Sequence, residues 1–393
     1  MLPAFFGRLT ALFSPRVLVS GTLPALLLMG YGALFLTVLT KLPVAEIWST
    51  GATLTTVLAL LCLIALTYLF ESLKTVFTQW MCGTAIWIPK SLTAQWSKDQ
   101  QSERDELNNK LRNVAEQLQG LKKLQAIWSK QSEELKAVPQ PAQVDNDDVV
   151  AVKDEARRYS VNLDNQYLAA VQVLIKRLRY CSAHASKEAV QAAKQELDIL
   201  LQRIDRTLDV ALNAADRERL AKFPQGETVA PTRFGNRMAA IDSYTSARYG
   251  MDANLIWHRL RQANNKTDAW QAVDDAKAAL DFIVSSLWVH VLVAFVTLTT
   301  MPLLWHQSRA VFVSLIIASI FFAFTFHAAA MEAVTSYGRE LSAALDLNRW
   351  SLLSALHLPT PLNAEEEYEI WTRFGNWIRY EQNERSRASI EYR

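Results

Sequence analysis

The sequence has 393 residues and an almost balanced charge, with 41 lysines and arginines against 39 aspartates and glutamates. Half of the residues are apolar and a fifth are charged, as in a large soluble protein, but the two kinds are segregated into blocks. Several blocks are long and carry no charge. This pattern excludes an ordinary soluble chain, because the helices of a soluble domain keep a polar face.

The charge-free blocks cover residues 17–40, 51–70, 282–305 and 310–331. Each is long enough to cross the hydrocarbon core of a bilayer, which takes about 20 residues. The sequence therefore predicts an all-α integral membrane protein with four transmembrane helices in two hairpins. The first block is predicted to be a retained anchor and not a cleaved signal peptide, because it exceeds the usual apolar region and a second span follows closely.

The lysines and arginines beside the predicted spans favour one orientation. Arg8, Arg16, Lys74, Lys90 and Lys98 flank the first hairpin, whereas the two hairpin loops carry Lys41 and Arg309. This bias predicts a multi-pass protein of the bacterial inner membrane with both termini in the cytoplasm. The cysteines, Cys62, Cys82 and Cys181, form no CxxC pair, which agrees with a reducing compartment.

The predicted domains are an N-terminal segment with the first hairpin (1–70), a cytoplasmic helical domain (71–281), the second hairpin (282–331) and an amphipathic helical tail (332–393). Within the helical domain, residues 71–90 are expected either at the bilayer interface or in an amphipathic helix packed on that domain. A proline-rich, acidic stretch near 138–150 is predicted to be a linker.

Apolar residues at helical spacing predict long helices in the cytoplasmic domain. The first carries a seam of Leu107, Leu111, Val114, Leu118 and Leu121, which fits either a helical hairpin within the chain or a parallel coiled coil between subunits. Two more amphipathic helices are predicted over 151–182 and 186–223. No strand-like alternation is present in this region, so a helical bundle is expected.

A stretch with an unusual density of arginine, aspartate, tyrosine and glycine runs from Pro231 to Asp252. Gly235 and Asn236 are expected to form the turn and N-cap of a helix over 237–249, with Gly250 as its left-handed end and Asp252 as the cap of the next helix. The candidate network at this cytoplasmic elbow comprises Arg233, Gly235, Asn236, Arg237, Asp242, Arg248, Tyr249, Gly250, Asp252, Trp257 and Arg259.

The elbow leads into the second hairpin and the tail. A helix is predicted to run without interruption from about Asp268 to Trp305, linking the helical domain rigidly to the third span. After the fourth span, one amphipathic helix is expected from Arg339 to about His357. Asn363 and the acidic residues behind it predict the start of another.

Several short motifs resemble a pattern found in a group of uncharacterised bacterial multi-spanning membrane proteins. They are PTRFGN, RYGMD and LIWHRL around the elbow and LDLNRWSLLSALHLPTP in the tail. The resemblance covers about the last 170 residues and has no established activity attached to it. It implies that part of the elbow acts as a unit, either as a structural joint or as a cytosolic docking or ligand site for a nucleotide or partner protein. The residues concerned are Arg233, Gly235, Asn236, Tyr249, Gly250, Asp252, Trp257 and Arg259.

No sequence motif points to catalysis. A P-loop, a GxGxxG after a strand, a GxSxG elbow and an HExxH are all missing from the sequence, and no metal or cofactor is expected. His290 and His327 are candidate intramembrane polar residues, because an ionisable side chain inside a span is costly. Two roles are open for them: a pore, proton-relay or gating function, or a structural one in which the hydroxyls of Thr297, Thr299 or Thr325 form hydrogen bonds with them.

The predicted function is that of a non-enzymatic bacterial inner-membrane protein, a membrane scaffold or signalling component. Its partners are expected to be the lipid bilayer and either further copies of the chain or a cytoplasmic protein. No nucleic-acid partner is expected. The alternative is an oligomeric pore, channel or membrane-disrupting effector that the cytoplasmic domain gates.

Overall fold

The computed structural model describes residues 14–40, 52–85, 88–134, 187–226, 228–263, 268–304 and 309–379. Nearly all of these residues are helical, and no strand is found among them. The prediction of an all-α chain is therefore confirmed for the described residues. The predicted linker at 138–150, the predicted helix at 151–182 and the connections within the two predicted hairpins lie outside them.

Four segments within the described ranges are long and apolar enough to cross a membrane. The first is formed by the π-helix η1 (Leu18–Thr22) and α3 (Leu23–Thr40), which the short helix α2 (Pro15–Val17) precedes. The others lie in α5 (Ala52–Cys82), α12 (Asp268–Leu304) and α13 (Arg309–Ala355). Their outward faces expose large apolar side chains such as Phe295, Leu298 and Phe324. Such a surface suits contact with lipid, and it supports association with a membrane.

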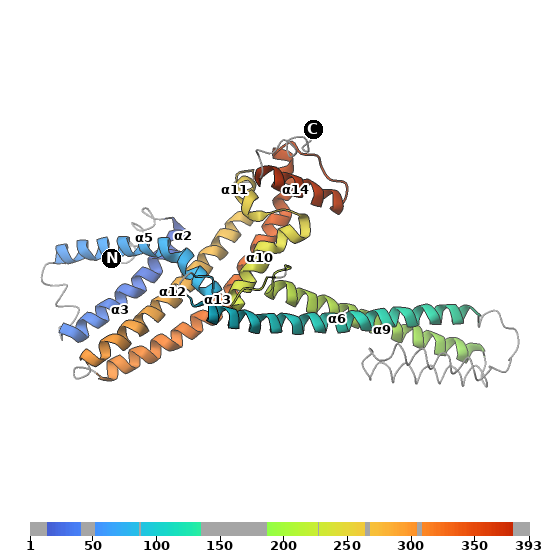
Figure 1. Cartoon of the computed structure of the whole chain (residues 1–393), viewed down its shortest axis with the longest axis horizontal. Coiled ribbons are helices and arrows are strands. Elements are labelled where there is room, and N and C mark those ends of the chain that lie inside the picture. The colour runs from blue at the N-terminus through green and yellow to red at the C-terminus, as the bar shows by residue number, and fades with distance from the viewer. Residues whose placement is uncertain are drawn as a thin grey trace. The chain divides into compact units, whose positions relative to one another are not determined.

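The four segments pack together in one unit, which comprises residues 1–100 and 221–393. Figure 1 shows α12 and α13 side by side over much of their length. On the other side of α12, a cluster that includes Ala25, Leu63 and Val289 joins α3, α5 and α12. In lipid, apolar burial gives no driving force between helices, so predicted spans depend on close packing of this kind to stay together.

Two of these helices are longer than predicted. The helix α5 continues to Cys82 and so includes part of the segment expected at the interface, and α13 joins the fourth span to the tail helix expected from Arg339. Gly338 does not interrupt α13. A Cβ atom there would lie 2.6 Å from Ile241 Cγ1, so this glycine allows α10 to pack closely on α13. The uninterrupted helix predicted from Asp268 is confirmed to Leu304.

Beyond the apolar segments, α13 packs against α10 (Arg233–Tyr249) and α11 (Ala253–Ala263), and α14 (Ala364–Arg379) packs on both of these helices. Their shared core contains Ile256, Leu260 and Trp371, which are fully buried. The predicted start of α14 is confirmed, because Asn363 Oδ1 accepts a hydrogen bond of 2.9 Å from the Glu366 amide. The four apolar segments and the helices α10, α11 and α14 are thus parts of one packed unit.

The second unit comprises residues 101–220 and contains most of α6 (Lys90–Glu134) and α9 (Lys187–Lys222). The predicted seam packs within the chain: Leu118 and Leu121 of α6 are buried in one cluster with Leu197, Leu201, Ile204 and Leu208 of α9. Arg219 Nη1 also donates to Asn108 Oδ1 at 3.5 Å. The described part of this unit is therefore a pair of long helices with a leucine-rich interface.

Candidate functional site: a polar pocket between α10 and α14

The N-terminal end of α10 is packed tightly against the end of α5. Thr232 is the N-cap; its hydroxyl accepts a hydrogen bond from the Gly235 amide at 3.0 Å and donates to the Met81 carbonyl at 2.6 Å. The helix therefore starts at Arg233, and the expected turn and cap at Gly235 and Asn236 are instead its first turn. A Cβ atom on Gly235 would lie 2.7 Å from the Cys82 carbonyl oxygen, which leaves no room for a side chain.

Asn236 and Arg237 extend this packing to neighbouring segments. The buried Asn236 amide accepts from the Ala230 amide at 2.7 Å and donates to the Ala230 carbonyl and to Gln100 Oε1, each at 3.1 Å. Arg237 Nη1 donates to the Met331 carbonyl and to the Thr335 hydroxyl, each at 2.5 Å. The two bonds of Arg237 attach α10 to α13 at the end of the fourth predicted span.

The C-terminal end of α10 turns sharply beside α14. Gly250 adopts the predicted left-handed conformation, with φ of 70°, and a Cβ atom there would lie 2.7 Å from the Tyr368 carbonyl oxygen. Asp252 precedes α11 and accepts from the Asn254 amide at 3.0 Å, as a cap does. It also forms an ion pair with Arg379 of α14. Glycine is required at position 250 by both its backbone angle and its neighbours.

Two tyrosines of α10 share one carboxylate of α13. Tyr244 and Tyr249 donate to Asp346 at 2.9 and 2.8 Å, and Arg248 Nη1 donates to the Tyr244 hydroxyl at 3.2 Å. Burial raises the pKa of both phenols, and the hydrogen bonds to Asp346 raise the pKa further. The phenols are therefore held in their neutral, donating form.

Arg349 connects this group to α14. Its guanidinium lies 4.5 Å from the centre of the Tyr249 ring and donates to the buried Glu367 carboxylate at 2.7 Å. Sequence reasoning missed Asp346, Arg349 and Glu367 as members of this cluster. A signal was available, because Asp346 and Arg349 are three residues apart in the tail motif and so lie on one helix face.

A pocket of about 530 Å³ lies between the C-terminal half of α10 and α14. Residues before α10, on α10, at the α10–α11 turn and on α14 line it: Pro224, Gly226, Thr228, Ala239, Asp242, Ser243, Ser246, Gly250, Asp252, Asn254, Tyr368, Thr372, Gly375, Asn376 and Arg379. Most of these residues have polar side chains, and three candidate residues of the elbow, Asp242, Gly250 and Asp252, are among them. The elbow sequence therefore supplies one wall of a pocket.

Two carboxylates line the pocket, Asp242 and Asp252, and of the two Asp242 is the one without an ion pair to a lining residue. Its side chain is exposed to solvent on the wall of the open pocket. Burial raises the pKa of Asp242 above its usual range, and the negative charge of Asp252 raises it further. No hydrogen bond or ion pair reaches Asp242 within the described part of the chain. The pocket thus contains an uncompensated carboxyl group.

The remaining elbow residues lie apart from the pocket. Trp257 packs edge-on against Trp270 of α12, with 5.2 Å between ring centres, and Arg259 is exposed and donates to the Leu255 carbonyl of its own helix. Arg233 is exposed at the start of α10. The charged elbow residues therefore have separate neighbours. Arg237 bonds to α13 and Asp252 to α14, whereas Arg248 and Arg259 bond within their own helices.

Polar side chains also lie inside the spans. His290 is buried; its Nδ1 atom lies 2.7 Å from the Ser286 carbonyl, and its ring contacts Tyr31, Phe322 and Phe326. Thr297, expected as a partner, donates to the Val293 carbonyl of its own helix. His327 is exposed on α13. The two histidines are thus in different surroundings, one enclosed by aromatic rings and one on the outer face.

Ion pairs join the spans where the apolar sequence ends. Glu71 of α5 contacts Lys74 at 2.6 Å and accepts from Ser20 at 2.5 Å. On α12, Asp274 pairs with both Arg16 and Arg261, the latter at 2.5 Å, and Asp281 pairs with Lys277. These pairs link the first span, α5, α11 and α12 at the polar boundary, and sequence reasoning did not anticipate them.

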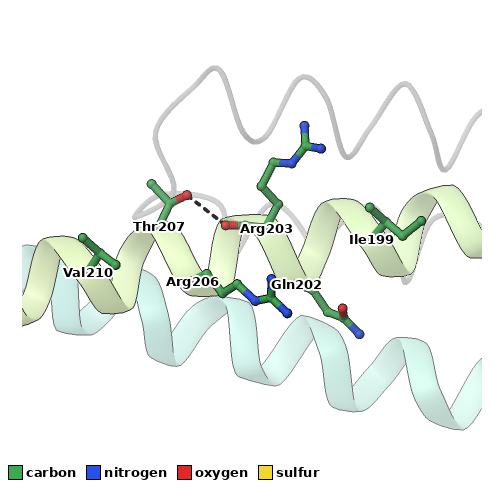
Figure 2. Close-up of a pocket in the computed structure, with 6 residues that line it drawn as sticks. All are labelled: Ile199, Gln202, Arg203, Arg206, Thr207 and Val210. Carbon is green, nitrogen blue, oxygen red and sulfur yellow. Dashed lines mark hydrogen bonds between the residues drawn. The ribbon is translucent and has the colours of Figure 1, made fainter.

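A shallow hollow lies on α9 in the second unit. Figure 2 shows its lining, in which Ile199 and Val210 stand at the two ends and Gln202, Arg203, Arg206 and Thr207 between them. Ile199 is 56% exposed and Val210 is 68% exposed. The Thr207 hydroxyl donates to the Arg203 carbonyl at 2.9 Å. The residues come from one helix face and present no converging polar groups, so this hollow is a weaker candidate than the pocket of α10.

Comparison with known proteins assigns neither a family nor a function to the chain. No family model matches the chain, and no curated protein or solved structure matches it. Among the described residues, no group of three or more histidine, cysteine, aspartate or glutamate side chains is placed to hold a metal ion. The functional argument therefore depends on the geometry of the chain itself.

Proposed function

We propose that this chain is a non-enzymatic scaffold or signalling component of the bacterial inner membrane, which binds further copies of itself or a cytoplasmic protein through its helical region. The membrane part consists of two hairpins, and both termini lie in the cytoplasm. One observation carries the proposal: α12 and α13 each continue without interruption from the predicted span into the buried apolar core around Trp371. A change of contacts at that core would be transmitted to the spans.

The second unit supports the binding role. Two long helices with a leucine seam form an extended surface, and the face of α9 away from the seam exposes Ile199 and Val210. Exposed apolar side chains between arginines suit a protein contact, because such contacts combine an apolar centre with charged surroundings.

The oligomeric state of the purified protein tests this function. Light scattering after size-exclusion chromatography in detergent is expected to show self-association that I199K and V210K weaken. K110A, on the exposed face of α6, is the matched control. The proposal is contradicted if the purified protein is strictly monomeric and crosslinking in cells attaches no cytoplasmic protein to it.

A pore is the alternative, and buried polar groups in the spans favour it. Ser285 and Ser286 are fully buried, and within the described part of the chain their hydroxyls form no hydrogen bond. Single-particle images that show a ring of subunits around a hydroxyl-lined axis support the pore. Particles without such an axis exclude it.

The orientation has its own test. A reporter fused after Arg393 is expected to behave as cytoplasmic, because lysine and arginine near the span ends favour that side. A periplasmic signal from this fusion would invert the topology.

A further inference from the structure

We propose that the pocket between α10 and α14 binds a small organic cation, an amine or a guanidinium compound, through Asp242 and the surrounding hydroxyl oxygens. This ligand site goes beyond the proposed scaffold or signalling role. It requires neither self-association nor a protein partner. Three features of the pocket support it: its hydrogen-bonding chemistry, its charge and its empty space.

The hydroxyl groups of the pocket present acceptors. Ser243 Oγ donates to the Ala240 carbonyl at 3.2 Å, Ser246 Oγ to the Ser243 carbonyl at 3.0 Å, and Thr372 Oγ1 to the Tyr368 carbonyl at 2.7 Å. A hydroxyl has one proton and two lone pairs, so each oxygen remains available to accept. A pocket with many acceptors fits a ligand with many N–H donors.

The charge of the pocket points the same way. Arg379 also lines the pocket, but it is already paired with Asp252 across the α10–α14 junction. Asp242 therefore contributes the net negative charge. A cationic ligand would stabilise its ionised form, which burial and Asp252 disfavour in the free protein. An anion would meet the repulsion of both carboxylates.

Two glycines leave the space for a ligand. A Cβ atom at Gly226 or at Gly375 would meet no atom within 4 Å, although both residues line the pocket. Gly375 lies inside α14, where glycine costs about 1 kcal/mol of helix stability relative to alanine. Packing does not require glycine there. A ligand that approaches the backbone does explain it.

The test compares putrescine with 1,4-butanediol, a neutral compound of the same length. Binding to the full-length protein in detergent is measured by isothermal titration calorimetry and by the shift of the melting temperature. Putrescine is expected to bind and to raise the melting temperature in proportion to the logarithm of its concentration. Equal responses to the two compounds, or no response to putrescine, overturn the proposal.

Two variants locate the site. D242N is expected to weaken putrescine binding at least tenfold, whereas E369Q, which removes a charge from the exposed face of α14, leaves it unchanged. G375M is expected to abolish binding and to melt no lower than the unsubstituted protein, because the side chain enters empty space. Unchanged putrescine binding by G375M or D242N places the cation elsewhere and refutes the assignment.

Discussion

The two ends of α10 differ in how completely they are packed. At its start, Gly235 and Asn236 have no free space or unused hydrogen-bonding group, and they attach the helix to α5 and to the segment before α10. At its other end, Asp242 and Ser246 face an open pocket. One continuous motif therefore contains a structural joint and, a few helical turns later, a surface that can receive a ligand.

The elbow sequence fits either a structural joint or a ligand site, and this difference between the two ends of α10 makes the two interpretations testable. A residue that only holds the fold together should lower stability when it is changed, while a residue that serves a ligand should lower binding and leave stability intact or improved. Substitutions at the two ends are thus expected to have opposite effects.

The largest loss of stability is expected for G235V. Its new side chain must displace the Cys82 backbone, and overpacking of this kind costs about 3 kcal/mol. Melting followed by tryptophan fluorescence in detergent measures the effect, and G30A on α3, where a Cβ atom meets nothing, is the control. A melting temperature equal to that of the unsubstituted protein would show that the start of α10 is not tightly packed.

N236A is expected to be the next most destabilising variant. It removes the groups that satisfy Ala230 and Gln100 in a buried position, at a cost of about 2 kcal/mol. The exposed amide of Asn254 provides the comparison, since N254A should melt like the unsubstituted protein. Equal melting of the two variants would argue against the hydrogen bonds described for Asn236.

Y249F is expected to cost about 1 kcal/mol at neutral pH, because Asp346 loses one of its two phenol donors. The raised pKa of Tyr249 gives a pH signature. Its stabilising effect is complete below the ordinary tyrosine pKa of about 10 and disappears as the pH rises towards the folded pKa. Y249F should therefore reduce the loss of stability in alkaline solution, and an identical alkaline profile for both proteins would contradict this role.

R379A is expected to have the smallest effect, below about 1 kcal/mol, because its ion pair with Asp252 is partly exposed and screened by solvent. Melting in low and high salt measures it, and the difference from the unsubstituted protein should shrink as salt is added. A larger loss than that of N236A would reverse the contrast between the two ends of α10.

Much of the secondary structure could be predicted from local sequence. The charge-free blocks, the left-handed turn at Gly250 and the cap at Asn363 depend on neighbours within a few residues. Errors arose where a distant segment decided the outcome. The tail helix predicted from Arg339 is a continuation of α13, in which Gly338 makes room for Ile241 of α10.

The sequence by itself determined that the chain is helical, where it becomes apolar and which stretch is rich in polar residues, because hydrophobic periodicity and capping act over one or two helical turns. Tertiary structure decided which polar residues meet. Asp346 lies 97 positions after Tyr249, and Arg379 lies 127 positions after Asp252. The packing of α10 against α13 and α14 brings these residues together, and it leaves Asp242 and Gly375 beside an open pocket.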